Sequence, residues 1–111
     1  MARPRKCRMV CSLPESSAFA PINAGDINTL VKMSVDEFET IRLIDNENNT
    51  QAECALRMGV SRTTIQSIYD NARKKIAECL IEGKRLVIEG GDYQLCGKRH
   101  PGCHKNCEYK K

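Results

Sequence analysis

The chain has few aromatic residues and no long apolar run. Its 111 residues include no Trp, and aromatic residues make up 5% of the sequence. We therefore expect one small domain whose core is mostly aliphatic. No apolar run approaches the roughly twenty residues that cross a bilayer, and the N-terminus lacks the apolar stretch of a signal peptide. These absences lead us to expect a soluble, cytoplasmic protein.

Sequence signatures of catalysis are missing as well. The sequence has two His, both near the C-terminus among cysteines, and it has neither a phosphate-cradling Gly loop nor a nucleophile elbow. We therefore do not expect an enzyme. The net charge of +4 is mild for a nucleic-acid-binding protein, so its distribution along the chain is more informative than its total.

The middle of the chain contains the pattern of two helices joined by a tight turn, as in a DNA-reading helix-turn-helix. Thr50, with Glu53 three residues later, forms a capping box that starts the first helix. That helix should end at about Met58, because Gly59 tolerates the positive φ of a sharp turn. Ser61 then caps the second helix.

This motif, residues 50–70, has an inner and an outer face. Ala55 and Gly59 are small where the helices approach, and three apolar residues should face inward: Val60, Ile65 and Ile68. The outward residues at the start of the second helix can pair with base edges and phosphates in the major groove: Arg62, Thr63, Thr64, Gln66 and Ser67. The alternative is an ordinary helical hairpin whose turn and apolar spacing only build a core.

Basic residues gather at the start of the chain and again after the motif. The first eleven residues contain no acid, and their basic side chains are Arg3, Arg5, Lys6 and Arg8. A second basic cluster lies on the continuation of the second helix: Arg73, Lys74 and Lys75. Both clusters could add salt-dependent affinity for phosphate. The alternatives are a solubilising terminus and a solvated helix face.

A supporting helix should precede the motif. Ser34 and Glu37 repeat the capping-box pattern, and apolar residues at helical spacing follow to about Asn46. The helix that begins after Ser61 should continue to Gly83, because one apolar stripe runs along it: Ile65, Ile68, Ala72, Ile76, Cys79 and Leu80.

The remaining segments suggest a small β element. Residues 85–88 and 93–95 flank Glu-Gly-Gly-Asp, which is typical of a β-hairpin or a bulged turn. A hairpin alone is marginal, so we expect residues 7–13 to add a third strand, from the same chain or from a second subunit. A strand donated across a two-fold axis would make a homodimer. Residues 16–32 should form a loop with a turn of helix near residues 26–31, packing two side chains onto the domain: Phe19 and Ile22.

The cysteines fall into two groups. Cys54 and Cys79 lie on apolar helix faces and should behave as small buried hydrophobic residues. The other five lie near the two ends of the chain: Cys7, Cys11, Cys96, Cys103 and Cys107. The C-terminal tail, which also holds two histidines, is too short and too charged to fold by burial alone.

A thiolate metal site would order these ends, since disulfides are rare in cytoplasmic proteins. The simplest arrangement is a tetrahedral Zn²⁺ held by Cys11, Cys96, Cys103 and Cys107. His100 or His104 could instead supply the fourth ligand, and Cys7 could replace Cys11. The spacing does not match the usual zinc ribbon, and the same cysteines could hold an iron–sulfur cluster. A reduced tail without metal is the remaining alternative.

Several separate motifs together resemble a family of small prokaryotic proteins of unknown function. They are RPRKCRMVC at 3–11, LVKMSVDEFETIRLID at 30–45, MGVSRTT at 58–64, ARKKIA at 72–77 and LVIEGGDY at 86–93. Members of that family are described as predicted DNA-binding proteins with a helix-turn-helix that resembles region four of sigma factors, often followed by a cysteine-bearing tail. The resemblance implies DNA binding in a bacterium or archaeon, but no established target, effector or metal.

We therefore expect a mainly α fold: a helix-turn-helix domain at 1–95, with a basic arm and a small β element, and a Cys/His-rich tail at 96–111. The expected function is sequence-specific binding of double-stranded DNA by a homodimeric transcriptional regulator that responds to metal or redox state through its terminal cysteines. Arg62 is the candidate for a bidentate guanine contact, worth roughly 1–3 kcal/mol of discrimination. The alternative is a protein-interaction module that docks on transcription machinery or another protein without reading DNA.

Overall fold

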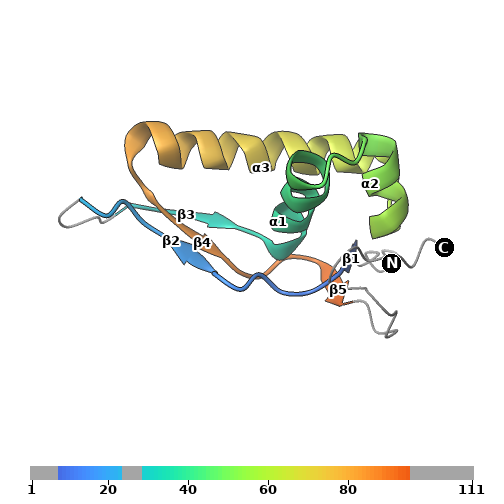
Figure 1. Ribbon diagram of the computed structural model, residues 1–111, viewed down its shortest axis with the longest axis horizontal. Helices are drawn as coiled ribbons and strands as arrows, with labels where there is room; N and C mark the ends of the chain where they lie inside the picture. The colour runs from blue at the N-terminus through green and yellow to red at the C-terminus, as the bar shows by residue number, and fades with distance from the viewer. Residues whose placement is uncertain (1–7, 24–28, 96–111) are drawn as a thin grey trace, which may run out of the picture.

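The computed structural model describes residues 8–23 and 29–95. Within these residues the chain forms three α-helices, a short π-helix and five short strands (Figure 1). The helices are α1 Val35–Ile41, its π-helical continuation η1 Arg42–Asn46, α2 Gln51–Met58 and α3 Arg62–Glu82. The strands are β1 Arg8–Val10, β2 Ala18–Phe19, β3 Leu30–Met33, β4 Arg85–Ile88 and β5 Tyr93–Leu95. A mainly helical domain with small sheets is thus confirmed.

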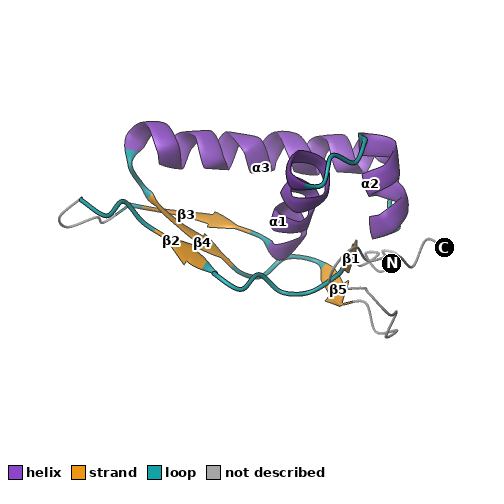
Figure 2. Cartoon of the chain, in the orientation of Figure 1, coloured by secondary structure: helices purple, strands orange, loops and turns teal. Residues whose placement is uncertain are grey.

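The long helix α3 sets the arrangement of the other elements. Its C-terminal half lies over a three-stranded sheet of order β2-β4-β3, while α2 packs against its N-terminal end (Figure 2). Helix α1 lies between α3 and the strand layer, and the two-stranded sheet of β1 and β5 lies near α2. None of the helices in the described part of the chain combines the length and hydrophobicity that a membrane-spanning segment requires.

The helix starts follow their predicted caps. Both capping boxes form: the Ser34 hydroxyl accepts from the Glu37 amide, and the Glu37 carboxylate accepts from the Ser34 amide at 2.9 Å. Thr50 and Glu53 make the same reciprocal pair at 3.0 and 2.8 Å. These interactions join residues three apart, so a local pattern suffices to predict them.

The predicted hairpin between residues 85–88 and 93–95 is wrong. Strand β4 instead pairs antiparallel with β2 and parallel with β3, while β5 pairs parallel with β1 in the other sheet. The chain between β4 and β5 wraps around the start of α1, where the Gly90 carbonyl accepts from the Val35 amide at 2.9 Å. The two glycines therefore serve a connection between sheets rather than a hairpin turn.

Residues 16–32 also differ from the predicted loop. Two of its segments are strands beside β4, and Leu30 and Val31 are extended rather than helical. The expected packing of Phe19 and Ile22 is not seen, since their side chains are 52% and 100% exposed. Thr29 is not helical either, and residues 26–28 of the predicted helical turn lie outside the described residues. The strand predicted at 7–13 is present as β1 and pairs with β5 of the same chain, but Cys7 lies outside the described residues.

Two small apolar clusters form the core. One joins the sheets to α1 and α3: Val10, Met33, Val35, Ala72 and Ile88. The other lies where α2 and the start of α3 close on η1: Leu43, Cys54, Ala55, Met58 and Ile65. Cys54 is fully buried, as predicted, and burial raises the pKa of its thiol to about 12. Cys79 is only half-buried, because α3 extends beyond the second core cluster toward its exposed last turn.

Candidate nucleic-acid interface

The turn between α2 and α3 is fixed by backbone hydrogen bonds and by one glycine. Gly59 ends α2 in the left-handed region, with φ of 71°, and the Val60 amide donates to the Ala55 carbonyl at 3.0 Å. A side-chain carbon on Gly59 would meet only Met9, at 3.8 Å. The backbone conformation, rather than a lack of space, is therefore what favours glycine at this position.

The start of α3 is held firmly against α2. Ser61 caps the helix, since its hydroxyl accepts from the Thr64 amide at 3.1 Å. Ile65 is completely buried and Ile68 is 7% exposed, and both face inward as predicted. Because interior side chains are closely packed, the first turns of α3 present their outer residues from a fixed position.

Four of the five predicted reading residues lie on the open surface of α3: Arg62, Thr63, Gln66 and Ser67. Gln66 and Ser67 follow Thr63 by three and four residues, so all three lie on the helix face that points away from the core. Thr64 differs, because it is half-buried and its hydroxyl lies 2.9 Å from the Ser61 hydroxyl. Its side chain therefore belongs to the helix cap.

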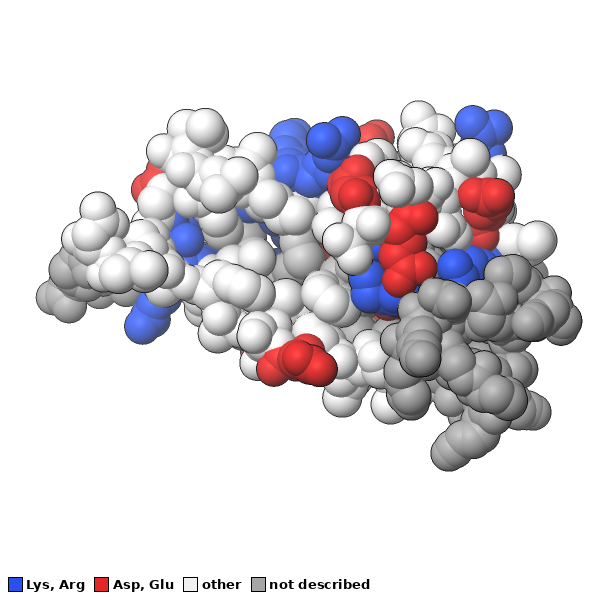
Figure 3. Space-filling model, viewed as in Figure 1, with Lys and Arg blue, Asp and Glu red and all other residues white. Residues whose placement is uncertain are grey.

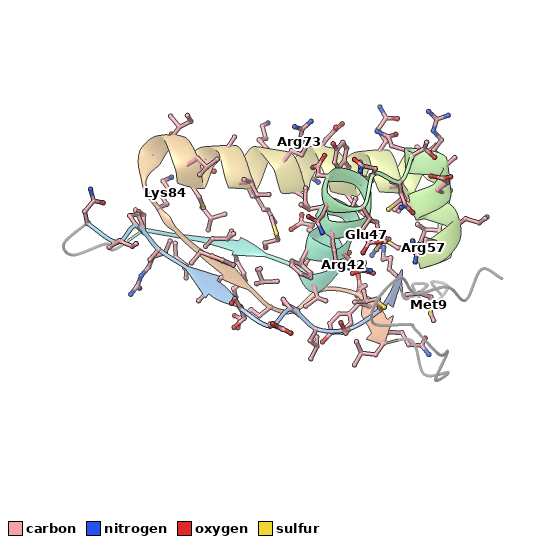
Figure 4. All side chains as sticks on the ribbon, viewed as in Figure 1. Met9, Arg42, Glu47, Arg57, Arg73 and Lys84 are labelled. Atoms are coloured by element: carbon pink, nitrogen blue, oxygen red, sulfur yellow. The ribbon has the colours of Figure 1, made fainter. Side chains whose placement is uncertain are left out.

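The three basic residues farther along α3 have different surroundings. Lys74 is exposed on the same face as Ser67 and carries no described ion pair. Lys75 instead pairs with Glu37 of α1 at 2.7 Å, so it ties the two helices together. Of the predicted phosphate-binding cluster, Lys74 and Arg73 remain exposed on the helix. Figure 4 shows that Arg73 points outward from α3.

Arg73 is already partnered within the chain. Its guanidinium lies 3.8 Å from the Asp45 carboxylate and 5.3 Å from the centre of the Tyr69 ring. The Tyr69 hydroxyl donates to Asp45 at 2.8 Å. Figure 3 shows acidic atoms beside the basic atoms over the middle of α3, so this surface has a mixed charge. Sequence reasoning missed Asp45 and Tyr69; the spacing of Tyr69 and Arg73 by four residues was the available signal.

An ion pair between partly exposed Arg42 and a buried carboxylate braces the segment that leads into α2. Arg42 of η1 makes a bidentate contact with Glu39, at 2.9 and 2.8 Å, and a third bond with Glu47 at 2.7 Å (Figure 4). Glu39 is 2% exposed and also accepts from the Cys11 amide at 3.2 Å. The hydrogen bond with Glu39 raises the pKa of Arg42 well above its ordinary value. These bonds connect β1, α1 and the turn before α2.

A family model described as "Protein of unknown function DUF134" matches residues 1–96. The chain belongs to this family. A UPF0251 protein of Desulfitobacterium hafniense strain Y51 is 59% identical over 113 residues, which cover 100% of this chain and 89% of that protein. A UPF0251 protein of Halothermothrix orenii is 52% identical over 107 residues, covering 95% and 78%. No solved structure matches the chain.

The terminal residues predicted to bind phosphate or metal lie mostly outside the described part of this DUF134 chain. The predicted residues that lie outside it are Arg3, Arg5, Cys7, Cys96, His100, Cys103, His104 and Cys107. Cys11 is described; it is 6% exposed and lies close enough to the Glu39–Arg42 pair to contribute to the raised pKa of Arg42. Within residues 8–23 and 29–95, no group of three or more His, Cys, Asp or Glu side chains is arranged to hold a metal.

Proposed function

We propose that this protein is a sequence-specific DNA-binding transcriptional regulator that inserts the start of α3 into the major groove. In this proposal α2 and α3 act as a helix-turn-helix of the kind found in region four of sigma factors. Helix α2 would lie across the backbone while α3 reads base edges.

The observation that carries the proposal is the exposed polar face at the rigidly packed start of α3. An ordinary helical hairpin needs only the buried stripe that contains Ile65 and Ile68. Such a hairpin has no need for exposed Arg62 and Gln66 side chains. It also has no need for the small hydroxyl side chains of Thr63 and Ser67 beside them. Arg can bond guanine and Gln can bond adenine in bidentate fashion, and small hydroxyl side chains let the helix approach closely.

Phosphate contacts would add affinity without sequence information. Lys74 lies about two turns beyond Ser67, the last of the proposed reading residues, and is available for such a contact. Arg73 would first have to exchange Asp45 for phosphate, so we expect it to contribute less to DNA affinity than Lys74 does. Arg3 and Arg5 complete the proposed set from the N-terminal arm.

Two substitutions separate these roles. Arg62→Ala should remove preference at one base-pair position, roughly 1–3 kcal/mol, while leaving affinity for non-specific DNA nearly unchanged. Lys74→Ala should weaken binding to all duplexes and lower the slope of log affinity against log salt by about 1. Lys32→Ala is the control, because Lys32 lies on β3 and pairs with Glu89 at 3.3 Å. Identical effects of Arg62→Ala and Lys74→Ala would contradict the groove assignment. An absence of salt-dependent DNA affinity would instead favour the protein-interaction alternative.

We also propose that the terminal cysteines bind a metal ion, with Zn²⁺ as the first candidate and an iron–sulfur cluster as the second. Thiolate ligands suit either group. Metal analysis of anaerobically purified protein should find stoichiometric metal that is lost in Cys103→Ser and retained in Cys54→Ala. A metal-free wild-type protein would contradict this proposal and leave the DNA-binding proposal untouched.

A further inference from the structure

An acidic side chain lies beside the surface of α3 that carries the proposed reading residues. The Asp45 carboxylate, on the short π-helix η1, lies 3.8 Å from the Arg73 guanidinium and accepts a hydrogen bond from the Tyr69 hydroxyl at 2.8 Å. We infer that Asp45 competes with DNA phosphate for Arg73 and so limits the affinity of the protein for duplexes of any sequence. This inference rests on the proposed function, because it assigns a regulatory role to a residue at the same interface.

Arg73 continues a row of side chains that begins at the reading end of α3. Gln66 follows Arg62 by four residues. Tyr69 follows Gln66 by three, and Arg73 follows Tyr69 by four. Residues at this spacing lie one above another along a helix. Arg73 is therefore about 16 Å along the axis from Arg62. Since the major groove is about 12 Å wide, a helix that reads bases with Arg62 brings Arg73 to the level of the flanking phosphates.

The fold fixes the position of Asp45. Leu43, two residues earlier in η1, is 1% exposed within the second core cluster. Arg42, at the start of η1, is held by the carboxylates of Glu39 and Glu47. A π-helical turn is rare in proteins and frequently marks a functional site. These contacts hold a carboxylate beside the cation that a phosphate would need.

The pair between Asp45 and Arg73 is open to solvent, with 39% and 62% of the two side chains exposed. Exposed ion pairs add little to stability, so this pair contributes little to holding η1 against α3. A phosphate that approaches the guanidinium also approaches the carboxylate, and like charges repel within the Debye length of about 8 Å. DNA must therefore displace Asp45 before Arg73 can neutralise a phosphate and release its counterion.

Weaker affinity for the DNA backbone has a use in a regulator. A genome offers about 10⁶–10⁹ competing non-specific sites. Because phosphate contacts supply nearly all non-specific affinity, a cation that is paired within the chain leaves more of the protein free to find its own site. Asp45 would in this way lower affinity without changing which bases α3 prefers.

A second ion pair in the chain provides a charge-matched control. Lys32 on β3 and Glu89 after β4 pair at 3.3 Å, and their side chains are 62% and 59% exposed. Both line a hollow together with Lys75. Lys75 leaves α3 on nearly the opposite side from Arg73, since successive helical residues are about 100° apart. Glu89→Gln therefore removes one carboxylate and frees one cation, as Asp45→Asn does, but away from the proposed interface.

Fluorescence anisotropy of a labelled duplex of arbitrary sequence, titrated with the full chain between about 50 and 200 mM salt, tests the inference. Asp45→Asn should bind more tightly than wild type. It should also steepen the slope of log affinity against log salt by about 0.9, so that its advantage shrinks roughly 3.5-fold across this range. Glu89→Gln should keep the wild-type slope. The double variant Asp45→Asn/Arg73→Ala should lose the steeper slope, because it lacks the freed guanidinium. Far-UV circular dichroism should be unchanged in every variant.

Equal slopes for wild type and Asp45→Asn would overturn the inference, and so would equal steepening in Glu89→Gln. A steeper slope that persists in the double variant would also overturn it, because the gain would then come from lost repulsion rather than from Arg73. A purely structural role for Asp45 would lower the Tm of Asp45→Asn and leave the slope unchanged.

Failure of this inference differs from failure of the proposed function. Wild type that binds the duplex with a slope that Asp45→Asn does not change contradicts the inference alone. Wild type that shows no salt-dependent affinity for the duplex contradicts the proposed function and the inference together.

Discussion

The turn at Gly90 and Gly91 allows two neighbouring glycines to be compared. Both have positive φ, 78° and 103°. A side-chain carbon on Gly90 would meet nothing within 4 Å, whereas one on Gly91 would lie 2.5 Å from the Asp36 carboxylate and 2.6 Å from the Ser34 Cβ. Gly90→Ala and Gly91→Ala therefore impose similar backbone strain but very different steric overlap.

Positive φ costs a non-glycine residue roughly 1–2 kcal/mol, and the stiffer unfolded chain returns about 0.4–1 kcal/mol. We expect Gly90→Ala to lower the free energy of unfolding by about 1 kcal/mol. Gly91→Ala adds the displacement of Ser34 and Asp36 at the start of α1, and overpacking of this kind costs about 1–3 kcal/mol more. The expected total for Gly91→Ala is about 3 kcal/mol.

Thermal and urea unfolding, followed by circular dichroism, measure the difference. A change of 1 kcal/mol moves the Tm of a domain of this size by roughly 4–8 °C. Gly90→Ala should therefore lower Tm by several degrees and Gly91→Ala by more than about 12 °C. Equal values for the two variants would refute the close approach of this turn to the cap of α1.

Three further predictions concern the elements that hold the proposed interface. Thr50→Ala should lower the free energy of unfolding by about 1 kcal/mol in a urea titration, because it removes the cap of α2; an unchanged midpoint would argue against that cap. Glu39→Gln should cost roughly 1.5–3 kcal/mol, because the Arg42 guanidinium loses the buried carboxylate and keeps only Glu47 as an anionic partner, whereas a cost near zero would show that the pair is solvated. Burial raises the pKa of Cys54 from 9.0 to about 12, so the unfolded chain loses this proton first as pH rises. The free energy of unfolding should then fall between pH 9 and 12, by up to about 1.4 kcal/mol per pH unit, and Cys54→Ala should flatten that decline; equal slopes would contradict the burial.

The sequence predicts the helices well and the strands poorly. Caps such as Thr50 and Ser61 depend on residues three positions away, and the buried stripe of α3 follows from helical periodicity. Strand β4 depends on partners more than fifty residues away in sequence, and its segment has no local feature that selects β2 and β3 over β5. The glycines at positions 90 and 91 indicated a turn with positive φ. They did not indicate whether that turn joins two strands of one hairpin or connects two sheets.

The candidate interface shows the same division. The exposure of Arg62, Gln66 and Ser67 follows from their helical positions relative to Ile65. The pairing of Arg73 with Asp45 could not be predicted, because it depends on where η1 carries the chain before α2. Local periodicity therefore identifies the outer face, and only the fold reveals which of its cations are already paired.

The most direct test of the proposed function is a selection of random DNA duplexes by anaerobically purified protein, with wild type and Arg62→Ala compared side by side. We expect wild type to enrich a defined motif and Arg62→Ala to lose preference at one base-pair position of that motif. If wild type enriches no motif, α3 does not read DNA sequence and the proposed function is contradicted.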